Sequence, residues 1–125
     1  MKELTKAEQQ VMEYLWKIGK GFVKDIRDQF PNPKPAYNTV STIIRILEKK
    51  VVVGHQSFGK SHQYYPLVSK NEYKKGRFKD IVKKHFSNSY KTFVSFFTKD
   101  DELSLTELEE MKKMVEEEIK KRKNK

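Results

Sequence analysis

Short polar and cationic side chains recur at helical spacing in the stretch YNTVSTIIRILEKK, residues 37–50. They are Asn38, Ser41, Thr42, Arg45 and Lys49. The short polar groups come first, the cations follow, and Glu48 is the one acid in the stretch. Small polar side chains at this spacing can hydrogen-bond to base edges in a DNA major groove while the cations contact phosphates. The alternative interpretation is a solvated helix face that is poor in acids.

The helix that would position these groups is predicted by Val40, Ile43, Ile44 and Leu47, which fall at i, i+3, i+4 and i+7 and form a buried face opposite the polar one. A shorter helix is predicted over residues 24–30. The prolines of residues 31–35 require a loop between the two helices. The helix over residues 24–30, the loop and the helix over residues 37–50 together form a helix-turn-helix, in which the second helix is the recognition helix. A proline-rich ligand for another protein is the alternative interpretation of the loop.

A β-hairpin is expected directly after the recognition helix. Two β-prone runs, residues 51–57 and 61–65, flank a turn in which Gly59 supplies a positive φ. Such a hairpin would be the wing of a winged helix, with Lys60 at its tip against a phosphate. His55 and His62 would face each other across it. Without a carboxylate or thiolate nearby they make a poor metal site, so no metal is expected.

Helix starts are marked three times by a capping box, in which a serine or threonine and the acid three residues later satisfy each other's backbone N–H groups. The pairs are Thr5 with Glu8, Ser69 with Glu72, and Ser104 with Glu107. Together with the hairpin they predict a mostly α fold with a small β-wing. We expect a winged helix-turn-helix DNA-binding domain over residues 1–68 and a helical domain over residues 69–125.

The C-terminal helices carry more large apolar side chains than isolated helices could bury, and such faces are typical of interfaces. We therefore expect a dimerisation surface. Its candidate residues are Tyr73, Phe78, Ile81, Phe86, Phe93, Phe97, Leu108, Met111 and Val115.

The charge of the chain favours a polyanionic partner. Its 27 Lys and Arg outnumber 17 Asp and Glu, a formal net charge of +10, which suits nucleic acid, a membrane surface or an acidic protein. The absence of cysteine rules out disulfides and thiolate metal sites and fits a reducing compartment. No apolar stretch approaches the roughly 20 residues of a membrane span, and no signal peptide is apparent, so membrane insertion is not expected.

The chain resembles a known bacterial family, the penicillinase and copper-responsive repressors (the BlaI/MecI/CopY family). The resemblance lies in LTKAEQQVMEYLW at 4–16, YNTVSTIIRILEKK at 37–50, HQYYPLVSKNEY at 62–73 and FFTKDDELSLTELEEM at 96–111. It implies a cytoplasmic winged-helix repressor that binds a palindromic double-stranded DNA operator as a homodimer held by its C-terminal helices. It also implies base contacts from Asn38, Thr39, Ser41 and Thr42, with Arg45 beyond them, and a backbone contact from Lys60.

The chain departs from the family in three places. It lacks the paired cysteines of the copper-responsive branch, so copper sensing through thiolates is excluded. For the β-lactam branch, the resemblance implies that repression is relieved when a membrane metalloprotease sensor pathway cleaves the repressor at an Asn–Phe bond. Here the region contains Ser95, Phe96 and Phe97 without Asn, so Ser95–Phe96 and Phe96–Phe97 are the candidate bonds and the inducing signal stays open. The family's glycine after the recognition helix is replaced by Val51, which would be strained at positive φ, so either the helix ends differently or this position is locally costly.

Two other classes of function fit the sequence. The basic charge permits an RNA-binding module, although no aromatic residues are placed for base stacking on an exposed sheet. A protein-interaction adaptor would use the amphipathic last helix. An enzyme is not expected, and neither is a cofactor, because no histidine accompanies a nucleophile and an orienting carboxylate and no glycine-rich phosphate loop is present.

Overall fold

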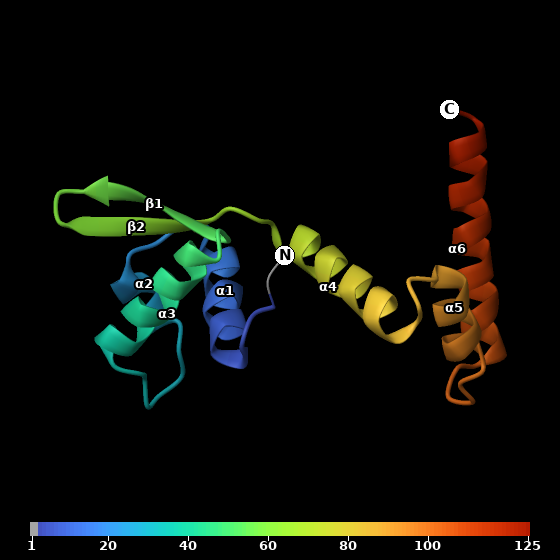
Figure 1. Cartoon of the computed structure of the whole chain (residues 1–125), viewed down its shortest axis with the longest axis horizontal. Coiled ribbons are helices and arrows are strands. Elements are labelled where there is room, and N and C mark those ends of the chain that lie inside the picture. Colours follow the sequence, from blue (N-terminus) through green and yellow to red (C-terminus); the bar gives the residue numbers. More distant parts are fainter. Residues whose placement is uncertain (1–2) are drawn as a thin grey trace. The chain divides into compact units, whose positions relative to one another are not determined.

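The computed structural model describes residues 3–125, which form two compact units that meet between Phe78 and Lys79. Along the chain the elements are α1 (Lys6–Ile18), α2 (Val23–Asp28), α3 (Tyr37–Lys49), β1 (Val53–Phe58), β2 (Ser61–Pro66), α4 (Lys70–His85), α5 (Tyr90–Thr98) and α6 (Leu105–Lys123) (Figure 1). Three helices and a hairpin precede a helical C-terminal part, so the predicted fold class, mostly α with a β-wing, is confirmed. The unit boundary lies inside α4, whereas the domain boundary was predicted at the end of the wing.

The helix starts follow the capping boxes seen in the sequence. At α1 the Glu8 N–H donates to Thr5 Oγ1 at 3.2 Å and the Thr5 N–H donates to Glu8 Oε1 at 3.1 Å. The same reciprocal bonds start α4, from Ser69, and α6, from Ser104. Gly19 ends α1 with φ +84°, a conformation that costs glycine little.

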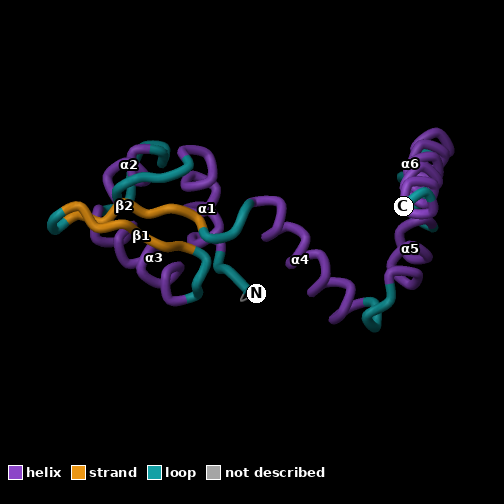
Figure 2. Tube along the Cα trace, turned by 90° about the horizontal axis from the view of Figure 1, so that it is seen from above, coloured by secondary structure: helices purple, strands orange, loops and turns teal. Residues whose placement is uncertain are grey.

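The core of the N-terminal unit lies where α1, α2, α3 and the β1–β2 hairpin meet (Figure 2). Apolar side chains at helical spacing supply it because those positions share one face of each helix. Trp16 packs on its edge and donates Nε1–H to the Val68 carbonyl at 2.9 Å. The buried members of the core are Leu4, Val11, Met12, Leu15, Val23, Ile26, Val40, Ile44, Leu47, Val52, Val53, Tyr64, Val68 and Tyr73.

The wing is an antiparallel hairpin in which Phe58 pairs with Ser61 across a two-residue turn. Gly59 has φ +62° in that turn, as the sequence predicted. The base of the hairpin is fastened to the segment between α1 and α2, because Gly21 and Tyr64 exchange backbone hydrogen bonds of 2.9 and 2.8 Å. This pairing fixes the direction of the wing relative to the helices.

The end of α3 is a Schellman motif with a valine at its left-handed position. The Val52 N–H donates to the Leu47 carbonyl at 3.2 Å and the Val51 N–H donates to that of Glu48 at 3.0 Å. Val51 has φ +63°. The strain expected from the sequence is therefore present, because a β-branched side chain is disfavoured in this region.

Replacing Val51 with glycine is expected to stabilise the fold by about 1 kcal/mol. The valine side chain is 72% exposed, so little packing is lost while the strain is relieved. Urea unfolding at a fixed protein concentration measures the change. Val51→Ala is the matched control, because alanine also shortens the side chain but keeps the Cβ. Equal stabilisation by both variants would contradict the role of the backbone conformation.

The C-terminal unit consists of the second half of α4 together with α5 and α6. Rings of Phe86, Phe93, Phe96 and Phe97 contact one another, with centroids 5.4 Å apart in each of three pairs. Val82 is its one buried apolar side chain. Within residues 3–125, none of the helices has the length and apolar character needed to cross a membrane.

Candidate nucleic-acid interface

The predicted recognition helix, α3, turns one face into the core and the opposite face outward. Val40, Ile44 and Leu47 are fully buried, which fixes the rotation of the helix. The predicted contact residues that lie exposed are Asn38, Thr39, Thr42, Arg45, Lys49 and, at the wing tip, Lys60. Six hydrogen-bonding or cationic side chains therefore share the outer surface of α3 and the wing.

Ser41 departs from the prediction. Its exposed fraction is only 8%, so its expected place on the exposed polar face is wrong. In a helix it lies one residue after Val40 and three before Ile44, which puts it at the border of the buried face.

The loop before α3 is held by two cationic side chains that hydrogen-bond to backbone carbonyls. Arg27 donates Nε–H to the Pro35 carbonyl at 2.7 Å, and Lys34 Nζ donates to the Phe30 carbonyl at 2.6 Å. These contacts tie the end of α2 to the start of α3. The two cations thus position the recognition helix.

Thr42 has a defined hydrogen-bonding direction. Its hydroxyl donates to the Asn38 carbonyl at 2.8 Å. The hydroxyl proton is used within the helix, so Thr42 offers a partner the oxygen lone pairs and its methyl group. A base edge that donates a hydrogen bond, or a thymine methyl group, is the complementary partner in a major groove.

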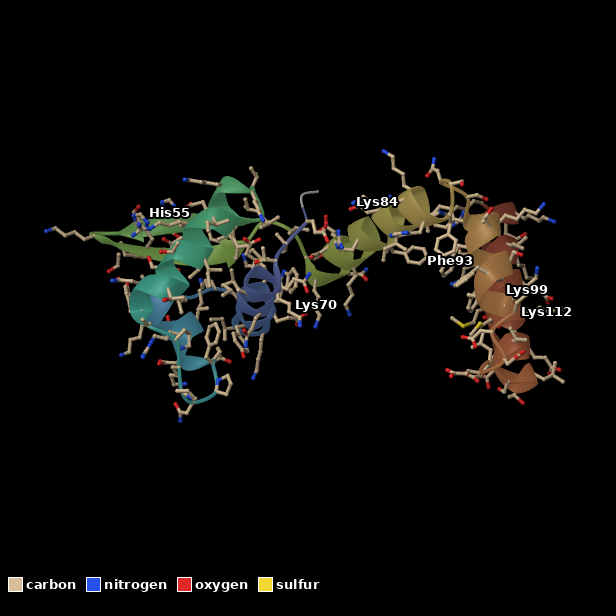
Figure 3. All side chains as sticks on the ribbon, turned by 60° about the horizontal axis from the view of Figure 1, so that its bottom comes forward. His55, Lys70, Lys84, Phe93, Lys99 and Lys112 are labelled. Atoms are coloured by element: carbon tan, nitrogen blue, oxygen red, sulfur yellow. The ribbon has the colours of Figure 1, made fainter. Side chains whose placement is uncertain are left out.

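The histidines of the wing lie beside a carboxylate, contrary to the expectation from the sequence. His55 and His62 stack with centroids 4.1 Å apart and planes 6° from parallel, and His55 Nδ1 contacts Glu48 Oε2 of α3. Figure 3 shows His55 on the wing. In the described part of the chain no group of three or more His, Cys, Asp or Glu could hold a metal ion. The contact joins the wing to the recognition helix.

The ring of Tyr64 contacts those of both histidines edge-on, and Tyr64 is 4% exposed. Burial raises the pKa of its hydroxyl, the Glu48 carboxylate raises it further, and Arg45 opposes the change. Tyr64 therefore stays protonated and neutral at physiological pH, and the positive charge near it comes from side chains such as Arg45.

A pocket of about 590 Å³ opens between α2, the start of α3 and the wing. We call it the wing pocket. Several of its polar side chains, Lys24, Tyr37, Ser61 and His62, were not predicted as contact residues. They lie on three elements that only the fold brings together, so no sequence spacing could identify them. The lining residues are Phe22, Val23, Lys24, Asp25, Tyr37, Asn38, Ser41, Arg45, Lys60, Ser61, His62 and Tyr64.

The predicted dimerisation residues fall into three groups. Tyr73 is 6% exposed and belongs to the N-terminal core, with its ring 5.6 Å from that of Trp16; its place in a dimer interface is therefore wrong. The half-buried residues are Phe86, Phe93, Phe97, Leu108 and Met111, and the exposed ones are Phe78, Ile81 and Val115. Tyr73 was misassigned because its partner Trp16 lies far away in the sequence.

Further apolar side chains lie exposed on the C-terminal unit. Leu105, Met114 and Ile119 line α6, and Phe96 on α5 is 70% exposed. The candidate cleavage residues Ser95, Phe96 and Phe97 lie inside α5, and the first two are exposed. An apolar surface of this extent is typical of a protein–protein contact.

Comparison with known proteins relates the chain to the penicillinase repressors. The model of the penicillinase repressor family matches residues 4–117. The penicillinase repressor of Bacillus licheniformis is 22% identical over 116 residues, which cover 92% of this chain and 91% of that protein. The match therefore extends over both compact units.

Proposed function

The chain belongs to the penicillinase repressor family of bacterial transcriptional repressors, and from this membership we propose that it represses by binding a palindromic DNA operator as a homodimer. The observation that carries the proposal is the outer face of α3, where Asn38, Thr39, Thr42 and Arg45 lie exposed beside the wing. Repression would follow from physical occlusion of a promoter. The protein would act in the cytoplasm.

In this proposal α3 enters the major groove, whose width of about 12 Å accepts an α-helix. Asn38, in the first turn, is suited to the paired donor and acceptor of an adenine edge. Thr42 would accept a hydrogen bond or contact a thymine methyl group, because its proton is held by the Asn38 carbonyl. Arg45 and Lys60 would contact phosphates or, for Arg45, a guanine. Sequence preference thus comes from the first turns of α3.

The dimer would place two α3 helices in successive major grooves about one helical turn apart. The exposed apolar residues of α5 and α6 support an interface between the C-terminal units. Relief by proteolysis would separate the two DNA-binding units. Because Ser95 and Phe96 lie within a helix, cleavage beside them would require α5 to unfold locally first.

Replacing Asn38 or Thr42 with alanine is expected to weaken operator binding by about 1–3 kcal/mol and to leave binding to random duplex almost unchanged. Lys60→Ala should weaken both alike, because a phosphate contact carries no sequence information. The measurement is titration of both duplexes by fluorescence anisotropy at one salt concentration, with the operator obtained by selection from random-sequence DNA.

Asn71→Ala is the matched control for Asn38→Ala. Both asparagines are exposed and occupy the second position of a helix, but only Asn38 lies on the recognition helix. If the Asn38, Thr42 and Lys60 variants all lose as much affinity for random DNA as for the operator, the proposal of direct base contacts is contradicted.

A further inference from the structure

The wing pocket gathers basic and hydroxyl-bearing side chains from three elements. Lys24 comes from α2, Arg45 from α3, and Lys60 and His62 from the wing. Tyr37 and Ser61 add hydroxyl groups. A volume of about 590 Å³ is that of a small-molecule site, enough for a segment of sugar–phosphate backbone.

The acid that lines the wing pocket is already engaged. Asp25 Oδ2 accepts the Phe22 N–H at 2.9 Å, so this carboxylate is held at the start of α2. The other acid nearby, Glu48, contacts His55. The lining holds three cations, Lys24, Arg45 and Lys60, and one carboxylate, Asp25, so an excess of positive charge remains to attract an external anion.

His62 is the imidazole side chain that lines the wing pocket. Its ring stacks on that of His55. His55 contacts Glu48, whereas His62 lines the wing pocket. The charged and titratable groups around it are Lys24 and Asp25 from α2, Tyr37, Arg45 and Glu48 from α3, His55 from β1, and Lys60 and Tyr64 from the turn and β2.

We propose that the wing pocket binds a backbone phosphate of the DNA, and that His62 contacts this phosphate in its protonated form, so that duplex binding takes up a proton. The inference rests on the proposed function, since it concerns the same DNA-binding surface. A phosphate oxygen attracts the cationic imidazole more strongly than the neutral ring. By linkage, any ligand that favours the protonated ring binds more tightly in more acidic solution.

The first experiment measures binding of the full-length chain to a fixed duplex recovered from random-sequence DNA by selection. At constant salt, the wild-type protein should bind about fivefold more tightly at about pH 6 than at about pH 8, the order of effect of one linked proton. His62→Gln should remove most of this difference. His85→Gln is the control, because His85 is exposed at the end of α4 and does not line the wing pocket.

The second experiment measures the salt dependence of the same binding. Lys24→Gln should reduce the slope of log K against log salt by about 1, as expected for one lost phosphate contact. Lys17→Gln, an exposed lysine near the end of α1, should leave the slope unchanged. If His62→Gln binds duplex with the same difference in affinity between the two pH values as the wild-type protein, the proton-linked contact is overturned. If Lys24→Gln shows the same slope of log K against log salt as the wild-type protein, the phosphate site is overturned. Recovery of no duplex by the wild-type chain would instead overturn the proposed function, and this inference with it.

Discussion

Replacing Val115 with glutamate is expected to convert the protein into a monomer and to weaken operator binding by about 10²-fold or more. Val115 is 59% exposed on α6, beside Met114 at 68% and Ile119 at 48%. In a homodimer these side chains would be covered by the second copy. A carboxylate placed there would have to be buried without a partner, which costs several kcal/mol.

The large effect on DNA binding follows from the geometry of a palindrome. Two linked recognition helices bind their half-sites with an effective concentration that a single unit lacks. The proposed contacts of α3 with DNA would be unchanged in the variant, so binding to a single half-site should be unaffected. Glutamate is also a better helix former than valine, so α6 itself should persist.

Sedimentation and operator titration measure the two parts of this prediction. Thr106→Glu is the matched control, because it also replaces a β-branched residue of α6 with glutamate but lies in the exposed first turn. There a negative charge is favoured by the helix dipole. A Val115→Glu protein that still sediments as a dimer would show that this part of α6 is not the interface.

The elements of the fold were predictable because their signals are local. The capping box of Thr5 and Glu8 depends on residues three positions apart, and the turn at Gly59 on one residue that tolerates positive φ. The buried stripe of α3 also repeats over short spacing. At Val51 the comparison with the family's glycine left two outcomes open, a different helix end or a costly left-handed valine, and the structure has the second, with φ +63°.

The errors concern contacts between residues far apart in the sequence. The partner of Tyr73 is Trp16, and nothing in the spacing of the two indicates that they meet. Glu48 reaches His55 only because the hairpin folds back beside α3. Ser41 is 8% exposed, and such burial depends on what packs against α3, which periodicity along α3 alone cannot give.

The ion pair of Glu8 and Lys50 is a further long-range contact, and it fastens the end of the recognition helix to the start of α1. Lys50 Nζ donates to Glu8 Oε1 at 2.5 Å and to the Glu3 carbonyl at 3.1 Å. Glu8 is 5% exposed. Charged hydrogen bonds that are shielded from water in this way contribute more than surface pairs do.

Replacing Glu8 with glutamine is expected to destabilise the N-terminal unit by about 2 kcal/mol at neutral pH. Glutamine can still accept the Thr5 N–H, so the variant removes the charge and spares the cap. Glu13→Gln is the matched control, because its pair with Lys70 has half-exposed side chains and should contribute about 0.5 kcal/mol or less. Urea unfolding at fixed protein concentration measures both changes.

The destabilisation by Glu8→Gln should also depend on pH in a defined direction. Burial raises the pKa of Glu8, but hydrogen bonds from Lys50 and the Thr5 backbone, with the charge of Lys50, outweigh burial and leave the pKa below its ordinary value of 4.5. A carboxyl whose pKa is lowered by folding adds stability above that ordinary value, and the contribution is lost as the pH falls through the folded-state pKa. The wild-type and Glu8→Gln proteins should therefore differ fully near neutral pH and converge in acid below 4.5. A difference that is constant over this range would mean that the charge of Glu8 does not contribute.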